Sequence, residues 1–266
     1  MSQFCFNTFN QSPFVGGHID LMTKVDAAAA AGFIFFGPDA YYIEAWLQDG
    51  GTLQALANRL AAIKKSCWEI AASLVLGDRA ESLAAARKAM PIASVLEPTR
   101  IQINVGTQVD QKSTTNLAEI CELLRPTGAK IAIEYLPFMP LRSIGKTFQL
   151  VQQLGLDCAG VLVDTWHHFR GTDNDEDLDA LPLDALAYVQ FEDAPKVIST
   201  NLTDETLNRR VFPGEGEFPL HRFRQRMKAK GFVGVVSVEA ISAEWRNRDI
   251  FEFARRAYAT SVPFWL

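Results

Sequence analysis

The sequence predicts a single α/β domain, a closed parallel (β/α)8 barrel that spans residues 1–266. Three observations support this fold: eight short apolar segments are typical of buried strands, helical patterns lie between most of them, and no linker is long enough to divide the chain. The predicted strands are Phe4–Phe9, Phe33–Phe36, Glu69–Leu76, Arg100–Val105, Lys130–Tyr135, Val161–Asp164, Ala187–Phe191 and Val235–Glu239.

The connections between these strands carry the apolar periodicity of helices that pack on a sheet. The predicted helices are His18–Ala31, Thr52–Ser66, Arg79–Val95, Thr114–Leu124, Ile144–Leu154 and Leu220–Lys230. Several end in a glycine suited to a left-handed cap, notably Gly32, Gly128, Gly155 and Gly231. An open doubly wound sheet is the alternative fold, but no glycine-rich dinucleotide-binding turn follows the first strand.

Composition narrows the classes of partner. Hydrophobic residues make up 48% of the chain, which allows a large core. The formal net charge is −5 and no long Lys/Arg run occurs, so we expect neither nucleic acid nor an anionic membrane surface as a partner. No apolar segment approaches the roughly 18 residues that would span a bilayer.

The cysteines and the terminal segments give weaker indications of the cellular compartment and of oligomeric state. Cys5, Cys67, Cys121 and Cys158 lie far apart, and the first residues lack the features of a signal peptide, so we expect reduced thiols in a cytoplasmic protein. The apolar tail, Val262–Leu266, has two interpretations. It plugs the lower end of the barrel, which we favour, or it contacts a second subunit of a homo-oligomer.

Four predicted strands carry an oxygen donor near their C-terminal ends, where the active sites of such barrels lie. The donors are Glu134, Asp164, Gln190 and Glu239, from four consecutive strands. Taken singly, each could cap the next helix or pair with an arginine. Together, three carboxylates and a carboxamide predict a site for Mn²⁺ or Mg²⁺, because the cation offsets their mutual repulsion.

At these positions the chain resembles the sugar phosphate isomerase/epimerase family with the xylose isomerase-like TIM barrel. The matching motifs are Ile133-Glu134-Tyr-Leu-Pro137, Val163-Asp164-Thr-Trp-His167, Val189-Gln190-Phe-Glu-Asp-Ala-Pro195, Arg210-Val-Phe-Pro-Gly-Glu-Gly216 and Ser237-Val-Glu239. The resemblance implies a divalent metal held by Glu134, Asp164, Gln190 and Glu239. Gln190 replaces the histidine that is commonest in the family, and its harder oxygen donor favours Mg²⁺ or Mn²⁺ over zinc.

The resemblance also implies roles in substrate binding. His167 matches a histidine that contacts substrate near the metal, and Arg210 matches an arginine that reaches a substrate oxygen. His168, the next residue, is expected to point elsewhere if the segment is extended. The segment Pro213–Glu217 lacks the Lys-Ser/Thr ending of a phosphate-binding loop and does not follow a strand, so we interpret it as a loop before the helix at Leu220.

The expected activity is that of a metal-dependent isomerase or epimerase acting on a sugar or keto-polyol. A base removes the proton alpha to a carbonyl, an enediolate forms, and Glu134 and Glu239 exchange the roles of base and acid.

Two alternatives remain open from the sequence. One is a dehydratase acting on a cyclic keto-polyol, such as a keto-inositol or a dehydroshikimate-like compound. The other is a sugar-binding module that keeps the barrel without turnover. A third possibility, an endonuclease of the abasic-site type that shares this barrel, is disfavoured. Such enzymes build a histidine-rich site for several zinc ions, whereas this chain has only four histidines and no basic patch.

Overall fold

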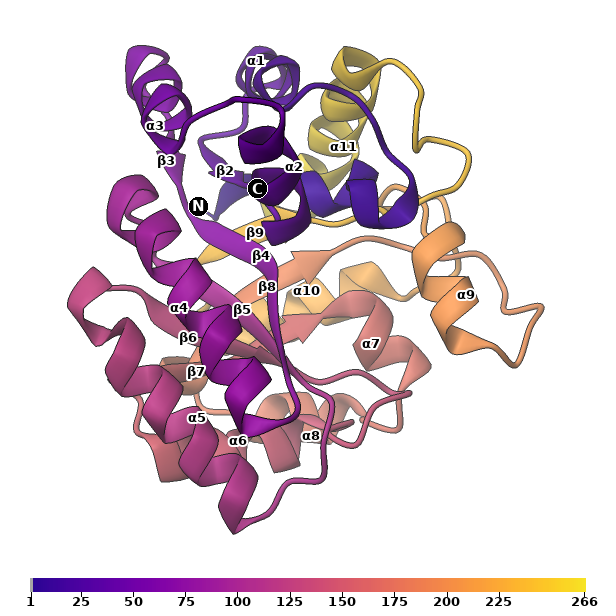
Figure 1. Ribbon diagram of the computed structural model, residues 1–266. Coiled ribbons are helices and arrows are strands. Elements are labelled where there is room, and N and C mark those ends of the chain that lie inside the picture. The colour runs from indigo at the N-terminus through magenta and orange to yellow at the C-terminus, as the bar shows by residue number, and fades with distance from the viewer. Residues whose placement is uncertain (1) are drawn as a thin grey trace.

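The computed structural model describes residues 2–266 and contains one parallel sheet that curves into a barrel (Figure 1). The strands are β1 (Gln3–Asn7), β2 (Phe35–Gly37), β3 (Ser66–Cys67), β4 (Glu69–Leu76), β5 (Arg100–Val105), β6 (Lys130–Glu134), β7 (Ala159–Asp164), β8 (Leu186–Phe191) and β9 (Val235–Val238). Their order in the sheet is β3-β2-β1-β9-β8-β7-β6-β5-β4.

The short strand β3 and strand β4 together form the third strand of the barrel. Only Trp68 separates them, β3 pairs with β2, and β4 pairs with β5. An isolated parallel bridge between Asp39, which follows β2, and Ala71 of β4 joins β2 to β4 nearer the C-terminal ends of the strands. The sheet is thus nearly closed, and the predicted single (β/α)8 barrel is confirmed.

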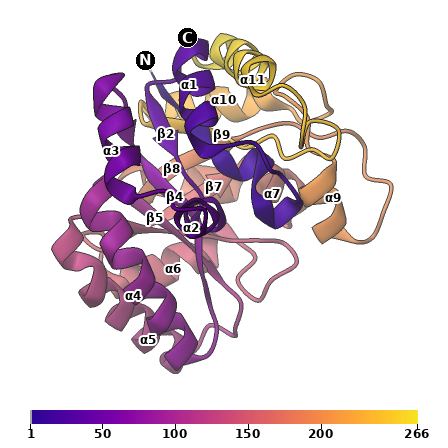
Figure 2. The same ribbon diagram turned by 45° about the horizontal axis from the view of Figure 1, so that its top comes forward.

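Helices surround the sheet on its outer face. They are α1 (Leu21–Ala31), α2 (Ala40–Gln48), α3 (Leu53–Ala62), α4 (Arg79–Leu96), α5 (Gln111–Leu124), α6 (Ile144–Leu154), α7 (Thr165–Arg170), α8 (Asp175–Ala180), α9 (Leu202–Asn208), α10 (Leu220–Ala229) and α11 (Ile250–Trp265). Figure 2 shows α3, α4 and α5 along one flank, and α1 beside α11 on another. All six predicted helices are present, and the four glycines expected as caps have positive φ.

Two expectations about this outer layer are wrong. The helix predicted to reach Ser66 ends at Ala62, because Lys64 adopts a left-handed conformation and Ser66 begins β3. The tail does not plug the barrel. It forms the last turn of α11, and the Trp265 ring packs against Phe191 and Phe223 between the sheet and the helices.

The cysteine expectation is also wrong in part. Cys121 of α5 and Cys158, just before β7, form a disulfide with their Cα atoms 6.0 Å apart, while Cys5 and Cys67 are free and buried. The cysteine pattern therefore no longer supports a reducing compartment. Among the residues that the structure describes, no helix has the length and apolarity needed to cross a membrane.

Candidate active site

The four predicted donors lie together at the C-terminal edge of the sheet. Glu134 ends β6, Asp164 ends β7, Gln190 lies in β8 and Glu239 directly follows β9. Asp164 is in register with Gln190, and Gln190 with Ser237, so alternation along the strands directs all four side chains into the barrel. Each is buried, with at most 3% of its surface exposed.

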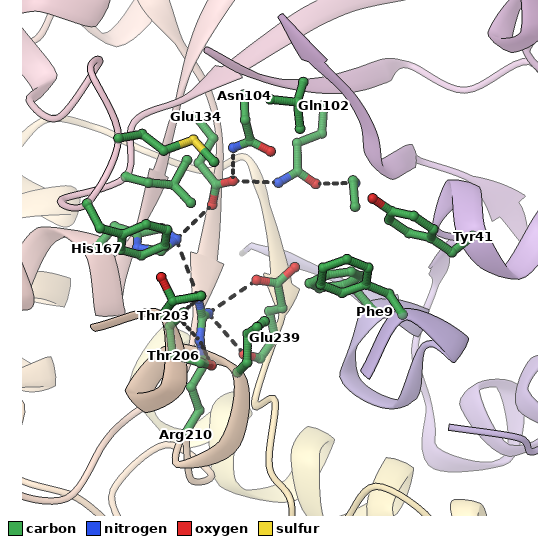
Figure 3. A pocket seen from close by; sticks show the side chains of 17 residues that line it. Phe9, Tyr41, Gln102, Asn104, Glu134, His167, Thr203, Thr206, Arg210 and Glu239 are labelled. Atoms are coloured by element: carbon green, nitrogen blue, oxygen red, sulfur yellow. Dashed lines mark hydrogen bonds and ion pairs between the residues drawn. The ribbon is translucent and has the colours of Figure 1, made fainter. Parts of the chain in front are cut away.

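Two carboxamides bind one oxygen of Glu134. Gln102 Nε2 and Asn104 Nδ2 donate hydrogen bonds to Glu134 Oε2 over 2.7 and 2.6 Å. Among residues 2–266 no group donates a hydrogen bond to the other oxygen, Oε1, which is buried and lies 3.3 Å from His167 Nε2 (Figure 3). Glu134 therefore presents one free oxygen to the cavity.

Glu239 is held in a similar way from the opposite side. Asn7 Nδ2 and Gln190 Nε2 each donate to Glu239 Oε1 over 2.8 Å, and Arg210 Nη1 lies 3.2 Å from Oε2. Burial raises the pKa of Glu239 well above its usual value, although the Arg210 guanidinium opposes this shift. Glu239 is thus suited to holding a proton, with a cation beside its second oxygen.

Arg210 is the central cation of the site. Its Nη1 donates to Asp164 Oδ2 over 2.8 Å and lies 3.5 Å from Glu192 Oε2, and its remaining donors bind Thr206. Burial opposes ionisation of Asp164, yet the Arg210 guanidinium holds the pKa of that carboxyl below its usual value. Burial also raises the pKa of Glu192 well above normal. The arginine therefore offsets part of the negative charge of the Asp164, Glu192 and Glu239 side chains.

The two histidines diverge because Thr165–Arg170 is a helix. Asp164 caps that helix, its Oδ1 accepting from the His167 backbone N–H over 2.7 Å. His167 faces the cavity, with Nε2 3.5 Å from Arg210 Nη2. His168 packs against Phe169 and Phe223, and burial lowers its pKa to about 4. His168 thus points away from the cavity, but the extended segment on which that prediction rested is wrong, because the residues form a helix.

Part of this cluster lines a cavity of about 170 Å³. Its polar part is formed by Glu134, His167, Arg210 and Glu239 together with Gln102, Asn104, Thr203 and Thr206 (Figure 3). The rest of the wall is largely apolar, from Phe9, Phe14, Tyr41, Val75, Leu136, Phe138, Met139 and Leu207. The cavity thus combines a charged end with an apolar wall that suits the C–H faces of a small ring or chain.

The donor chemistry of the site fits a divalent metal ion. Glu134 Oε1 and Gln190 Oε1 are buried and lack hydrogen-bond partners in the part of the chain that the structure describes. Within residues 2–266, donor atoms of Glu134, Asp164 and His167 lie within 4.8 Å of one another. A cation would satisfy the unpartnered oxygens, whose burial is otherwise unfavourable. The ligand set of Glu134, Asp164, Gln190 and Glu239 stays a prediction, and the geometry adds His167 as a candidate.

Sequence reasoning missed the carboxamides that hold the glutamates. Gln102 and Asn104 alternate with isoleucines in β5, and Asn7 ends β1. The alternation of polar and apolar residues in β5 is consistent with a polar face inside the barrel. It is equally consistent with a strand that has one solvated face, so the sequence alone does not distinguish the two. Glu192 was also missed; its Oε1 accepts from Thr165 Oγ1 and the Trp166 backbone N–H.

Comparison with known proteins gives relatives over part of the chain. An inosose isomerase of Halalkalibacterium halodurans is 27% identical over 158 residues, which cover 59% of this chain and 55% of the relative. A 3-dehydroshikimate dehydratase of Pseudomonas putida is 26% identical over 120 residues, or 45% of this chain and 19% of that protein. The chain therefore matches about half the length, or less, of these relatives.

Solved structures extend the likeness to the whole fold. The structure of an IolI protein with a binding zinc atom has a TM-score of 0.86 and 20% identity, covering 99% of this chain and 98% of that one. The structure of the probable 3-DHS dehydratase AsbF from Bacillus anthracis has a TM-score of 0.78 and 14% identity, covering 98% of this chain and 99% of that one. The family model for the xylose isomerase-like TIM barrel matches residues 25–260. The chain belongs to the xylose isomerase-like TIM barrel family, as its strand-end motifs predicted.

Proposed function

We propose that this protein is a metal-dependent isomerase or epimerase that acts on a small keto-polyol by removing a proton alpha to a carbonyl. One observation carries the proposal: two buried glutamates, Glu134 and Glu239, border one cavity, and none of the described residues donates a hydrogen bond to Glu134 Oε1. The partial similarity to inosose isomerases supports the same reaction class.

Four residues have distinct roles in the proposed reaction. Glu134 Oε1 accepts the proton from the substrate carbon, since its other oxygen is already bound by two amides. Glu239, whose pKa burial raises, returns a proton. His167 and Arg210 bind substrate oxygens beside these carboxyls. A divalent ion bound here would polarise the carbonyl and stabilise the negative charge that develops on its oxygen.

We also propose Mn²⁺ or Mg²⁺ as the bound ion, held by Glu134, Asp164, Gln190 and Glu239. Carboxylate and carboxamide oxygens are hard donors that suit these ions. The Gln190 amide is oriented for this role, because its Nε2 donates to Glu239 and leaves Oε1 free. Zinc is the alternative if His167 serves as a ligand in place of Gln190, since zinc prefers nitrogen donors.

A dehydratase is the second candidate function. Similarity to 3-dehydroshikimate dehydratases over 45% to 49% of the chain is the observation that favours it. Both reactions begin with removal of the same kind of proton. They differ in whether a β-hydroxyl is then expelled, so product analysis separates them.

Solvent-exchange measurements test the proposal before any product is known. Purified protein loaded with Mn²⁺ is incubated in deuterated water with a panel of ketoses, aldoses and cyclic keto-polyols, and label incorporation is followed by NMR. We expect Glu134→Gln and Glu239→Gln each to slow exchange by about 10²–10⁴-fold with the fold intact. The exposed Glu244→Gln is the control and should exchange normally. Near-normal exchange in both glutamate variants would rule the mechanism out.

Metal analysis tests the remaining alternative, a non-catalytic sugar-binding module. Elemental analysis of the purified protein and titration with Mn²⁺, Mg²⁺ and Zn²⁺ give both occupancy and preference. We expect an ion in stoichiometric amount, with weaker binding in Glu134→Gln. Absence of any divalent binding would favour the non-catalytic module.

A further inference from the structure

Strand β5 places two carboxamides directly against Glu134. Gln102 and Asn104 are two residues apart, so both side chains point into the barrel. They are buried, and both donate to the same oxygen, Glu134 Oε2 (Figure 3). Neither contact is assigned by the proposed mechanism to substrate or metal.

A bulge in β4 fixes the orientation of the Gln102 amide. The pairing of β4 with β5 shifts register between Ile70 and Leu74, and Ala72 within that interval has a φ of 45°. The Ala72 backbone N–H, turned out of the ladder, donates to Gln102 Oε1 over 2.8 Å. Because that oxygen is bound, Gln102 must direct its NH₂ group at Glu134.

Two donors at Oε2 leave the Glu134 carboxylate little freedom to rotate. Its Oε1 is then directed at the cavity and lies 3.3 Å from His167 Nε2. Glu239 has a matching arrangement, with Asn7 and Gln190 both donating to its Oε1. In each glutamate two neutral amides hold one oxygen, while the other oxygen faces the cavity in Glu134 and accepts from Arg210 Nη1 in Glu239.

We infer that Gln102 and Asn104 are positioning residues that orient Glu134 Oε1 toward metal and substrate, with the bulge at Ala72 as their anchor. This inference rests on the proposed function, in which Glu134 is a metal ligand and the base. Removing either amide lets the carboxylate rotate and lowers metal affinity through Glu134.

The experiment replaces each amide by an apolar side chain of similar size. Mn²⁺ affinity is measured by calorimetry for Gln102→Met, Asn104→Leu and a matched control, Asn116→Leu, which removes a buried amide in α5 away from the cavity. We expect a loss of roughly 10–100-fold in the first two variants and less than threefold in the control. In the Glu134→Gln background, the Gln102→Met change should add less than threefold.

Crystal structures of the same variants supply a readout that needs no metal. We expect Glu134 Oε1 to move away from its position beside His167 in Gln102→Met and to keep it in Asn116→Leu. An unmoved Glu134, or full additivity of Gln102→Met with Glu134→Gln, overturns the inference. If the wild-type protein binds no Mn²⁺, the proposed metal site fails, and the position of Glu134 in the variants alone decides the inference.

Discussion

Glu69 is a carboxyl group buried inside the barrel beneath the candidate active site. It has no exposed surface, Ser237 Oγ donates to its Oε1, and Cys5 Sγ lies 3.7 Å from the same oxygen. Within residues 2–266, the structure gives Glu69 no ion pair with a cation. Burial therefore raises its pKa from 4.5 to about 7, although the Ser237 hydrogen bond opposes the shift.

This shift predicts a pH dependence of stability that one substitution removes. Between pH 4.5 and about 7 the folded protein binds more protons at Glu69 than the unfolded chain does. The unfolding free energy should therefore fall as pH rises through this window, by about 3 kcal/mol at most. Glu69→Gln stays neutral and should lack this contribution.

Urea unfolding of both proteins from pH 4 to pH 8 measures the difference between their stability curves. We expect the unfolding free energy of Glu69→Gln to increase relative to that of the wild type as pH increases. Parallel curves across the whole range would show that Glu69 titrates normally in the folded state.

At the scale of elements, Asp193 organises the loop between α9 and α10. It follows β8, and its Oδ2 accepts from the backbone N–H groups of Gly214 and Gly216, while Oδ1 accepts from Phe218. Gly216 is required here, because a Cβ on it would lie 2.3 Å from Asp193 Oδ1. The glycines of Pro213–Glu217 thus wrap the chain around a carboxylate of the protein itself, which confirms the loop interpretation.

Asp193→Asn should therefore destabilise this loop. The amide keeps one acceptor oxygen and turns an NH₂ group toward backbone N–H donors, so at least one strong hydrogen bond is lost and a repulsive contact is added. We expect the unfolding free energy to fall by about 3 kcal/mol. Amide exchange at residues 214–218 should accelerate more than elsewhere. The exposed Asp184→Asn is the control, and equal exchange rates in both variants would contradict this account.

At the scale of the whole molecule, the barrel was predictable because its strands are buried on both faces. Continuous apolar runs such as Val161–Val163 are typical of parallel strands, and a polar residue that ends such a run is placed at the rim. This is why Glu134, Asp164 and Glu239 were found from sequence. Helices α2, α7, α9 and α11 were not predicted. The sequences of α7 and α9 are too short to show an apolar period.

The features that were not predicted from the sequence depend on how the closed barrel packs. The alternation in β5 is typical of a strand with one solvated face, and only the closed sheet makes that face an interior that holds Gln102 and Asn104. The disulfide was missed for a similar reason. Cys121 and Cys158 are 37 residues apart in sequence, and the packing of α5 near the start of β7 brings them together.

That disulfide should stabilise the whole domain without affecting the site. It closes a loop across α5, β6 and α6, which in the chain-entropy model raises the unfolding free energy by about 4 kcal/mol. Neither cysteine lines the active-site cavity, so Cys121→Ala with Cys158→Ala should lower the melting temperature and leave metal binding unchanged. Reductant should lower the melting temperature of the wild type toward that of the double variant and leave the variant unaffected. The buried free thiol of Cys67, changed to alanine, controls for loss of a packed sulfur, and this variant should still respond to reductant. A wild-type melting temperature that is insensitive to reductant, with thiol titration showing complete reduction, would mean that the bond contributes nothing to the stability of the fold.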